Sequence, residues 1–458
     1  MGYFAIEIPE IDIENISDFL RGKDFPFFLD SGGYFKRIGR YSYWGFEPVL
    51  RFSFKNNEVR FFEKDSESVL SNKEPFSFLK EITDKYKVPS CGKIFPFQGG
   101  FTGYLSYELG SYVEKIPLTR KDDYNLPDYF LCLYDVIFVH DILKNRFYVA
   151  GYNLNDKSFE KAERFVKTAE SYENSGQFYA EVGSELQSNF TKKNYLEAIS
   201  RAKEYIFAGD IYQVNISQRF KVDFQGDTYS FYKHFSKLSP APFGAFLDYH
   251  DFQILSNSPE RYLFINNGHI ETRPIKGTRK RGRNGEEDKK YIEELKNSEK
   301  DRAEHLMIVD LERNDLGRVA VFNSVKVSEF EIIESYANVH HMVSTVEASV
   351  DKKFGIVDCI KNSYPGGSIT GAPKIRSMEI IDELEPTFRS VYTGSVGYIG
   401  FDHTVDLNIA IRTAIIKDGT ISFQVGGGIV ADSEPEEEFN ETIVKAESFT
   451  KSISTLNS

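Results

Sequence analysis

Residues 213–224, QVNISQRFKVDF, decide the fold class of this chain. Apolar side chains occupy positions 214, 216, 220, 222 and 224, and polar side chains occupy most positions between them. Such alternation predicts a long strand with one buried face. A second alternating segment, Val405–Arg412, is followed by an Asp418-Gly419 turn that leads into Ile421–Val425. Long alternating strands joined by tight turns are typical of antiparallel sheets.

Helices are expected between these strands. Tyr195, Ile199 and Ala202 recur at helical spacing, and Gly209 stands where a C-terminal cap belongs. The residues before position 151 show short strands and turns instead. Further helices are predicted at residues 228–238, 286–297, 299–316, 354–363, 374–384 and 436–454.

The composition disfavours several classes of protein. The chain has 458 residues, of which 41% are hydrophobic, and a formal net charge of -13. An acidic protein repels phosphate backbones, so we expect no general nucleic-acid binding. The 3 cysteines show no CxxC spacing, which fits a reducing compartment and no thiolate metal site. Because no run is long enough for a membrane span and no signal-peptide pattern is present, we expect a soluble, cytoplasmic protein.

A lysine stands directly before a glycine in Pro274-Ile275-Lys276-Gly277-Thr278, at the end of an alternating run that follows an Asn267-Gly268 turn. The amine of lysine is a nucleophile only when it is unprotonated. Glycine lets the backbone approach a ligand closely. A surface lysine at a strand end is the plain alternative, and only residues further along the chain favour a functional interpretation.

Two pairs of acidic residues lie three positions apart on predicted helices, Asp301 with Glu304 and Glu438 with Glu441. Ser298 and Asp301 fit a capping box, and the helix dipole favours acids in a first turn, so each pair has a structural explanation. The alternative is that the two pairs meet around a hard cation. Oxygen-only ligands suit Mg²⁺.

Two glycine-rich segments offer main-chain N–H groups to an anion. Gly426-Gly427-Gly428 follows a strand and fits a carboxylate. Residues 365–374, PGGSITGAPK, resemble a phosphate-binding loop but have Pro373 where that motif requires Gly-Lys-Ser/Thr; they still predict N–H groups at the start of the next helix. The basic residues 279–283 are interpreted as a solvated loop or a small-anion contact.

In this order, the segments resemble the chorismate-utilising enzyme family, which includes the large subunits of anthranilate synthase and aminodeoxychorismate synthase and the isochorismate and salicylate synthases. The resemblance extends from about Thr191 to Lys451 and is weaker before that. The motifs that carry it are GDIYQVN at 209–215, SPER at 258–261, PIKGT at 274–278, EHLMIVDL at 304–311 with RNDL at 313–316, the loop from Ser368 to Lys374, and NET at 440–442 with KA at 445–446.

The resemblance implies an α+β fold in which two antiparallel β-sheets pack as a sandwich flanked by helices. It also suggests an N-terminal region, residues 1–188, and a chorismate-binding catalytic region, residues 189–458, that interleave in space. Related large subunits carry a tryptophan pocket between N-terminal strands and a Pro-x-Pro-aromatic segment, here Pro240–Phe243. The residues predicted to line such a pocket are Ser31, Pro242 and Phe243.

Two positions separate the activities within this family. Isochorismate-type members have a water-activating lysine where this chain has Gln213, and anthranilate synthases typically have alanine where this chain has Lys276. The lysine implies an aminodeoxychorismate synthase component I, which makes 4-amino-4-deoxychorismate from chorismate and ammonia for 4-aminobenzoate and folate biosynthesis. The alternative is an anthranilate synthase component I of tryptophan biosynthesis. A non-catalytic amino-acid-sensing subunit is disfavoured because it need not retain Lys276 and both acidic pairs.

The resemblance makes Lys276 the nucleophile and Glu260 the acid that protonates the leaving hydroxyl. Lys276 must then lose its proton, which costs roughly 4 kcal/mol if its pKa falls from about 10.4 to about 7.5. Glu260 needs the opposite shift in pKa to donate a proton at neutral pH. Ser258 as N-cap and Pro259 at the next position predict that Glu260 lies in the first turn of a helix, whose dipole lowers the pKa. Burial then has to outweigh the dipole.

The resemblance also implies a magnesium site. Glu304 and Glu441 would hold Mg²⁺, with Asp301 and Glu438 behind them. Like charges about 4 Å apart repel by roughly 4 kcal/mol at an effective dielectric near 20, so four acids and a dicarboxylate substrate need cations. The further residues expected to bind substrate are Gly277, Thr278, His341, Ser368, Tyr392, Arg412, Gly427, Gly428, Lys445 and Gln213.

Free ammonia is scarce at neutral pH, so a glutaminase is its expected source. No Gly-x-Cys-x-Gly elbow surrounds Cys91, Cys132 or Cys359, and the glutamine amidotransferase is therefore expected as a separate subunit. Tryptophan is the remaining partner that the resemblance suggests.

Overall fold

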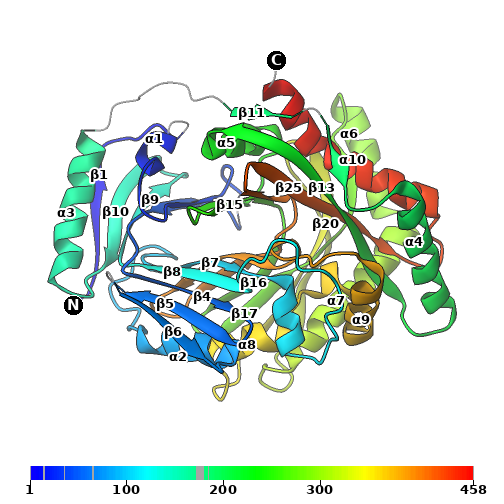
Figure 1. The fold of residues 1–458 in the computed structure, drawn as a ribbon, viewed down its shortest axis with the longest axis horizontal. Coiled ribbons are helices and arrows are strands. Elements are labelled where there is room, and N and C mark those ends of the chain that lie inside the picture. Colours follow the sequence, from blue (N-terminus) through cyan, green and yellow to red (C-terminus); the bar gives the residue numbers. More distant parts are fainter. Residues whose placement is uncertain are drawn as a thin grey trace.

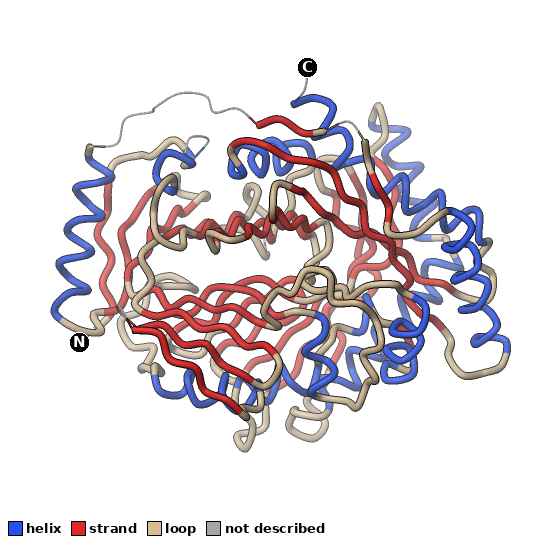
Figure 2. Tube along the Cα trace, in the orientation of Figure 1, coloured by secondary structure: helices blue, strands red, loops and turns tan. Residues whose placement is uncertain are grey.

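The computed structural model describes residues 2–13, 16–35, 37–63, 66–171, 180–183 and 185–456 (Figure 1). The strands form two large antiparallel sheets that lie one above the other, with helices on the outside (Figure 2). The α+β sandwich predicted from the sequence is therefore confirmed.

The first sheet contains the long alternating segment, which forms strand β13 (Gln213–Gly226) near one edge of that sheet. Its apolar positions are buried, because they pack against helices that cover this sheet. Along the sheet the order is β1 (Tyr3–Ile8), β10 (Arg146–Tyr152), β9 (Val136–Asp141), β3 (Tyr41–Gly45), β2 (Phe27–Asp30), β14 (Phe243–Asp248), β15 (Phe252–Ser258), β24 (Thr413–Lys417), β25 (Thr420–Ile429), β13 and β11 (Ala180–Val182), with β12 (Gln187–Ser188) and β21 (Gly371–Ala372) also paired to β13.

The second sheet contains the segment with the lysine. Along this sheet the order is β18 (Ile275–Lys280), β20 (Val339–Ser349), β17 (His269–Arg273), β16 (Arg261–Asn266), β23 (Val405–Asn408), β22 (Ser395–Gly400), β7 (Gly100–Leu105), β8 (Tyr129–Tyr134), β4 (Leu50–Lys55), β5 (Glu58–Glu63) and β6 (Ser66–Ser71), with β19 (Lys326–Ser335) also paired to β20.

The helices predicted at residues 228–238, 286–297, 299–316, 354–363, 374–384 and 436–454 form within two residues of those bounds. Thr191 caps the helix that begins at Lys192, and Gly209 follows its end with a φ of 82°. No helix of the described residues is both long and apolar enough to cross a membrane. The helices are α1 (Ser17–Leu20), α2 (Pro75–Lys85), the 3-10 helix η2 (Tyr107–Tyr112), α3 (Asp156–Glu170), α4 (Lys192–Phe207), α5 (Thr228–Leu238), α6 (Gly285–Lys296), α7 (Glu299–Gly317), α8 (Ile356–Ser363), the 3-10 helix η3 (Gly367–Ile369), α9 (Lys374–Leu384) and α10 (Pro435–Leu456).

Three clusters of buried apolar side chains hold the layers together. The cluster between the sheets is rich in aromatic rings, such as Phe27 and Tyr134, whose centroids lie 4.5 Å apart. A second cluster joins the first sheet to α3, α5 and α10, where Phe423 stacks on Phe449 at 4.3 Å. The third joins the second sheet to α2, α7 and α8. Burial of apolar area on both faces of each sheet thus stabilises the sandwich.

Strands from the two ends of the chain lie side by side in both sheets. β2 pairs with β14 in the first sheet, and β7 pairs with β22 in the second. The division into functional regions at residue 188 stays a prediction.

The chain crosses between the two sheets twice at one place. β15 of the first sheet ends at Ser258, and β16 of the second begins at Arg261. Beside this crossover, β23 of the second sheet ends at Asn408 and β24 of the first begins at Thr413. Ile409 N donates to the Glu260 carbonyl oxygen at 3.0 Å, so the two crossovers are hydrogen-bonded to each other.

The second crossover corrects the prediction of one strand from Val405 to Arg412. Only Val405–Asn408 forms a strand, and residues 409–412 connect it to β24 of the other sheet, because pairing stops after Asn408 and Arg412 has a φ of 49°. A left-handed residue turns the chain out of the plane of a sheet. Leu407 lies before the crossover and Ile409 lies within it, yet both side chains are buried. The alternating pattern therefore continues through the crossover and gave no sign of it.

Candidate active site

Glu260 lies in the crossover between β15 and β16, not in the helix that Ser258 and Pro259 predicted. The Ser258 hydroxyl accepts from Glu260 N at 3.2 Å, as a helix cap would. The same hydroxyl donates to the Ile409 carbonyl at 2.6 Å, and the chain enters β16 at Arg261 instead of turning. Pairing with the second crossover therefore overrides the local capping signal.

The Glu260 side chain is only 4% exposed. Burial raises its pKa to about 7, whereas the Ser368 hydroxyl, the Lys276 charge and the Ile275 N–H group oppose that shift. The Ile275 amide lies 3.4 Å from Glu260 Oε1. No helix dipole acts on this carboxyl, so the conflict expected from the sequence is absent.

Lys276 lies in a bulge of β18. The pairing of β18 with β20 shifts between Ile275 and Thr278, which leaves Lys276 and Gly277 outside the regular ladder. Gly277 has a φ of 77°, and a Cβ there would lie 2.8 Å from a methyl carbon of Leu295. The glycine is needed because only it fits this bulge without strain.

Burial lowers the pKa of the Lys276 amine, because the ammonium form loses hydration. The carboxylates of Glu304, Glu260 and Glu441 oppose this shift, and the Lys445 charge adds to it. Side chains from β18, α7, α10 and the crossover therefore lie within electrostatic range of one amine. The structure thus brings these predicted site residues together.

Glu304 is the acid without an internal partner. Within the described ranges its carboxylate accepts no hydrogen bond and forms no ion pair. Burial raises the pKa of Glu304, and the charges of Asp301 and Glu438 also favour the protonated form, while Lys276 and Lys300 oppose it. The influence of Glu438 shows that α7 and α10 bring their acids toward each other.

The other three acids of the predicted metal site already have partners. Lys445 donates to Glu441 at 2.6 Å, Ser433 to Glu438 at 2.6 Å, and Arg279 to Asp301 at 2.8 Å. Lys445 and Arg279 are cations, and the expectation of four unopposed acids did not include their charges. The local charge is therefore less negative than four unopposed acids would make it.

These acids do not form a closed ligand cluster. Among the described residues, the three metal-binding side chains whose ligand atoms lie within 4.8 Å of one another are His269, Glu271 and Glu347 on β17 and β20, not these acids. Mg²⁺ usually keeps several waters and uses one or two protein carboxylates. The unpartnered carboxylate of Glu304, which like Glu441 lies within electrostatic range of Lys276, fits that mode of binding.

The interpretation of residues 279–283 as a solvated loop is wrong for Arg279 and Lys280, which belong to β18, whereas residues 281–283 do lie in a loop. The small-anion contact stays a prediction. Arg279 belongs to β18 and pairs with Asp301 of α7. Arg281 follows the strand and binds both carboxylate oxygens of Asp288 on α6. Acids on the two following helices were the signal that could have revealed these pairs.

His341 and Arg412 form a second polar group near the lysine. Thr278 and His341 are cross-strand neighbours, and Thr278 Oγ1 lies 2.8 Å from His341 Nδ1. His341 Nε2 is buried and has no hydrogen-bond partner among the residues described. Burial lowers the pKa of His341 to about 3, with the Arg412 charge adding to the shift. Arg412 itself makes a long contact of 3.4 Å to Ser239 Oγ.

The triple glycine lies at an open edge of β25. This strand pairs with β13 as far as Ile429, but its pairing with β24 ends at Phe423. Gly427 and Gly428 lie beyond that point, so neither pairs with β24. Gln213 Nε2 occupies the space that a Cβ of Gly428 would need, and Gln213 Oε1 is buried without a partner in the described structure.

Tyr392 and Ser368 complete the predicted set. Tyr392 is buried beside Arg389, whose guanidinium lies 5.9 Å from its ring. Burial raises the pKa of Tyr195, and Tyr392 and Glu438 are both within electrostatic range of that residue. Ser368 lies in η3 and contacts Glu260, as described above.

Comparisons with known proteins agree with this geometry. Residues 25–451 match the family described as chorismate binding enzyme. The chain belongs to this family. The anthranilate synthase component 1 of Aquifex aeolicus is 39% identical over 97% of this chain and 93% of its own length. The aminodeoxychorismate synthase component 1 of Escherichia coli is 40% identical over 89% of this chain and 88% of its own.

A solved structure supports the same conclusion. The crystal structure of anthranilate synthase component I from Streptococcus pneumoniae superimposes with a TM-score of 0.81 at 30% identity, over 91% of this chain and 93% of that one. The protein is therefore a chorismate-utilising enzyme. Relatives of both kinds are similar to it to the same degree, so the comparisons do not distinguish the two activities.

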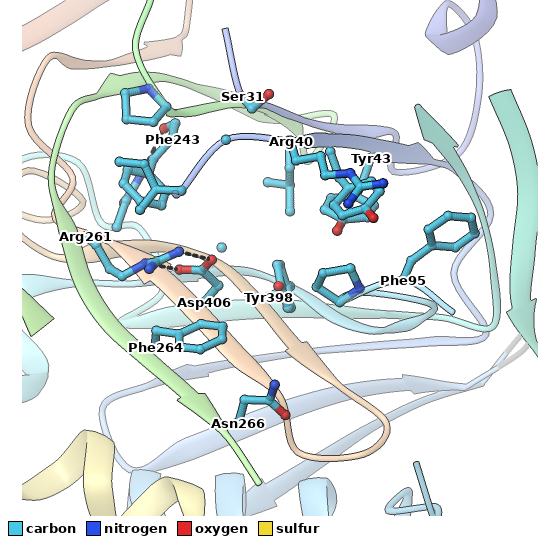
Figure 3. Close-up of a pocket in the computed structure, with 18 of the residues that line it drawn as sticks. Ser31, Arg40, Tyr43, Phe95, Phe243, Arg261, Phe264, Asn266, Tyr398 and Asp406 are labelled. Carbon is cyan, nitrogen blue, oxygen red and sulfur yellow. Dashed lines mark hydrogen bonds and ion pairs between the residues drawn. The ribbon is translucent and has the colours of Figure 1, made fainter. Parts of the chain in front are cut away.

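This chorismate-binding enzyme has a cavity between the two sheets, apart from the lysine site (Figure 3). Its volume is about 790 Å³, and the residues that line it include the three predicted for a tryptophan pocket, Ser31, Pro242 and Phe243. In Figure 3, Ser31 lies on the first sheet and Tyr398 on the second, with the recess between them. The structure thus brings the three residues together around one cavity.

The wall of this cavity contains a fully paired arginine. Arg261 donates to both carboxylate oxygens of Asp406 at 2.9 Å and to Glu271 at 2.8 Å, as the dashed lines of Figure 3 show for Asp406. The rings of Phe243 and Phe264 lie 5.3 and 4.8 Å from the guanidinium. Arg261 directly follows Glu260, so neighbouring residues of the crossover serve the cavity and the lysine site.

Proposed function

We propose that this enzyme is an aminodeoxychorismate synthase component I. The proposal is carried by a half-buried lysine, Lys276, whose pKa is lowered, within electrostatic range of a buried acid, Glu260, whose pKa is raised to about 7. Burial shifts the amine toward its nucleophilic form and the carboxyl toward its proton-donating form. A site that only bound a metal and a dicarboxylate would need neither shift.

The first step is attack by the neutral amine of Lys276 at C2 of the chorismate ring. The ring double bonds shift, and the bond from C4 to its hydroxyl breaks. The proton of Glu260 goes to that hydroxyl, which leaves as water. The lysine nitrogen is then bound to the ring as a secondary ammonium, and Glu260 is ionised.

The second step is attack by ammonia at C4. The double bonds shift back, and Lys276 leaves C2 as a neutral amine. The new ammonium group at C4 returns one proton to Glu260. Chorismate and ammonia are thus converted to 4-amino-4-deoxychorismate and water, and both side chains regain their starting states.

The remaining residues hold the two carboxylates of the substrate. Arg412, the neutral His341, Tyr392 and the amides of Gly427 and Gly428 are proposed to bind one carboxylate. Lys445 faces the other, on the side of the acids. Mg²⁺ held by Glu304 and Glu441, with Asp301 and Glu438 behind them, would supply positive charge there. Gln213, Gly277, Thr278 and Ser368 shape the space around the ring.

The rival assignment is anthranilate synthase component I, and product identity separates the two. The protein is incubated with chorismate, Mg²⁺ and ammonium. We expect a product that becomes 4-aminobenzoate only after a separate lyase is added. Fluorescent anthranilate formed without a lyase would favour the rival, and intact chorismate would overturn both assignments.

A separate glutaminase subunit is the proposed source of ammonia. The names of the relatives, component 1, agree with a second component. Cys132 and Cys359 are buried, and the exposed Cys91 has no nucleophile elbow around it. We therefore expect that glutamine does not replace ammonium for the chain alone, and that adding a glutaminase subunit restores turnover with glutamine.

Tryptophan is the proposed ligand of the cavity between the sheets. The aromatic Phe243 and the carboxylates of Asp406 and Glu271 would suit an indole ring and an ammonium group. Titration calorimetry with tryptophan checks this proposal. Binding that is weakened by Phe243→Ala would support it, and absence of heat would count against it.

A further inference from the structure

A second buried acid lies behind Glu260 on α7, and no step of the proposed reaction uses it. Glu312 is 3% exposed, and its Oε1 accepts a hydrogen bond from Gly367 N at 3.1 Å. Gly367 directly precedes Ser368, whose hydroxyl lies close enough to Glu260 to lower the pKa of that carboxyl against the effect of burial. A Cβ on Gly367 would lie 2.7 Å from a methyl carbon of Leu311, so the loop backbone rests directly on α7.

The same loop is fixed to α7 at a second point. Asp315, one turn after Glu312, accepts from the Lys374 ammonium, which also donates to the Ser363 carbonyl at 2.9 Å. The segment from Ser363 to Lys374, which carries Ser368, is therefore attached to one helix at both ends. Neither attachment contacts the proposed substrate or metal residues of α7.

Charge around Glu312 favours its neutral form. Burial raises its pKa to about 8, and Asp315 and Glu260 add to that shift, while Lys374 and the Gly367 N–H group oppose it. Burial raises the pKa of Tyr262, and the charge of Glu312 adds to that shift. A protonated carboxyl still has an oxygen that accepts the Gly367 hydrogen bond, so the contact does not depend on ionisation.

We propose that Glu312 is a positioning residue, which holds Gly367 so that the Ser368 hydroxyl stays against Glu260 and sets its acid strength. The role of Glu260 as a proton donor rests on the proposed function, but its titration does not. A hydroxyl that donates to a carboxylate favours the ionised form. Release of Ser368 therefore makes Glu260 a weaker acid.

The test is a pH titration of the protonated-carboxyl band by difference infrared spectroscopy, in which Glu260→Gln identifies the Glu260 signal. Ser368→Ala and Glu312→Leu should each raise the Glu260 midpoint by about one pH unit. Glu312→Gln keeps the acceptor oxygen and should leave the midpoint in place. Asp310→Asn, on the exposed face of the same helix, is the matched control.

The double variant Ser368→Ala with Glu312→Leu should shift the midpoint no further than either single variant, because both act through one hydrogen bond. An unshifted midpoint in Glu312→Leu, additive shifts, or an equal shift in Glu312→Gln would overturn the proposal. If Glu312→Leu does not fold, Glu312→Asp decides, since a shorter acid must give a shift of the same sign. Failure of chorismate turnover would concern the proposed function alone, because this measurement needs no turnover.

Discussion

The lysine site and the cavity between the sheets are built on the same pair of sheets but leave their polar groups in opposite states. In the cavity between the sheets, Arg261 is paired with Asp406 and Glu271. At the lysine site, Glu304 and His341 Nε2 have no partner within the described part of the chain. The two sites nevertheless begin at adjacent residues of one crossover.

This difference indicates which of the two, the lysine site or the cavity between the sheets, needs a ligand. A buried polar group without a partner costs about 1–3 kcal/mol, so such groups accumulate where a substrate or ion completes them. The lysine site has that character. In the cavity, Asp406 and Glu271 already pair with Arg261, so a ligand there would share these carboxylates and gain less from each polar contact.

The strongest test of the comparison is removal of the lysine. Lys276→Ala should reduce ammonia incorporation by at least about 10⁴-fold, because no neighbouring group replaces the nucleophile. Formation of 4-amino-4-deoxychorismate, coupled to a lyase, measures the loss. Lys280→Ala removes an exposed lysine of the same strand and should be close to wild type. Undiminished turnover in Lys276→Ala would refute covalent catalysis.

The next largest effect is expected at the acid. Glu260→Gln should reduce turnover by about 10² to 10³-fold, because the leaving hydroxyl loses its proton donor. In the wild type, the protonated fraction of Glu260 falls as pH rises through about 7. A pH profile of kcat/KM should therefore contain an inflection near that pH, which Glu260→Gln lacks. The same inflection in both proteins would assign it to another group.

The same acid should also affect stability, with a definite sign. Its folded pKa of about 7 lies above the ordinary value of 4.5, so its contribution to stability is complete at low pH and is lost as pH rises through about 7. The loss amounts to about 3 kcal/mol. Urea unfolding at pH 5 and pH 8 should show that Glu260→Gln gains this much relative to wild type at the higher pH. An equal difference at both pH values would contradict burial of an ionisable acid.

A smaller effect is expected in the cavity. Asp406→Asn leaves Arg261 with Glu271, so the unfolding free energy should fall by about 1–3 kcal/mol while turnover of chorismate stays near wild type. Denaturant unfolding and steady-state kinetics measure the two quantities. A large loss of turnover would show that the cavity and the lysine site are coupled through the crossover.

The smallest change in stability is expected at the surface of α10. Lys445 and Glu441 are about half exposed, so Lys445→Met should change the unfolding free energy by less than about 1 kcal/mol. Because Lys445 is proposed to face a substrate carboxylate, KM for chorismate should rise in the same variant. An unchanged KM would remove Lys445 from the site.

Much of the secondary structure followed from local patterns. Alternation placed β13, and helical spacing placed α4 and α5, because burial of one face fixes which residues can be apolar. Local patterns gave a wrong prediction for Glu260, because a Ser-Pro pair can precede a helix and can also stand in a crossover between strands. They also failed for residues 405–412, where both sheets bury the alternate side chains.

By itself, the sequence determined the antiparallel class, the acidic pairs and the lysine-glycine pair, because each depends on neighbours along the chain. Only the tertiary structure decided the partners of these groups. Arg279 donates to Asp301, Glu312 accepts from Gly367 N, and Glu304 has no partner among the described residues. The reason is physical: hydration and pairing of a charge depend on what folds against it, and those contacts join residues far apart in sequence.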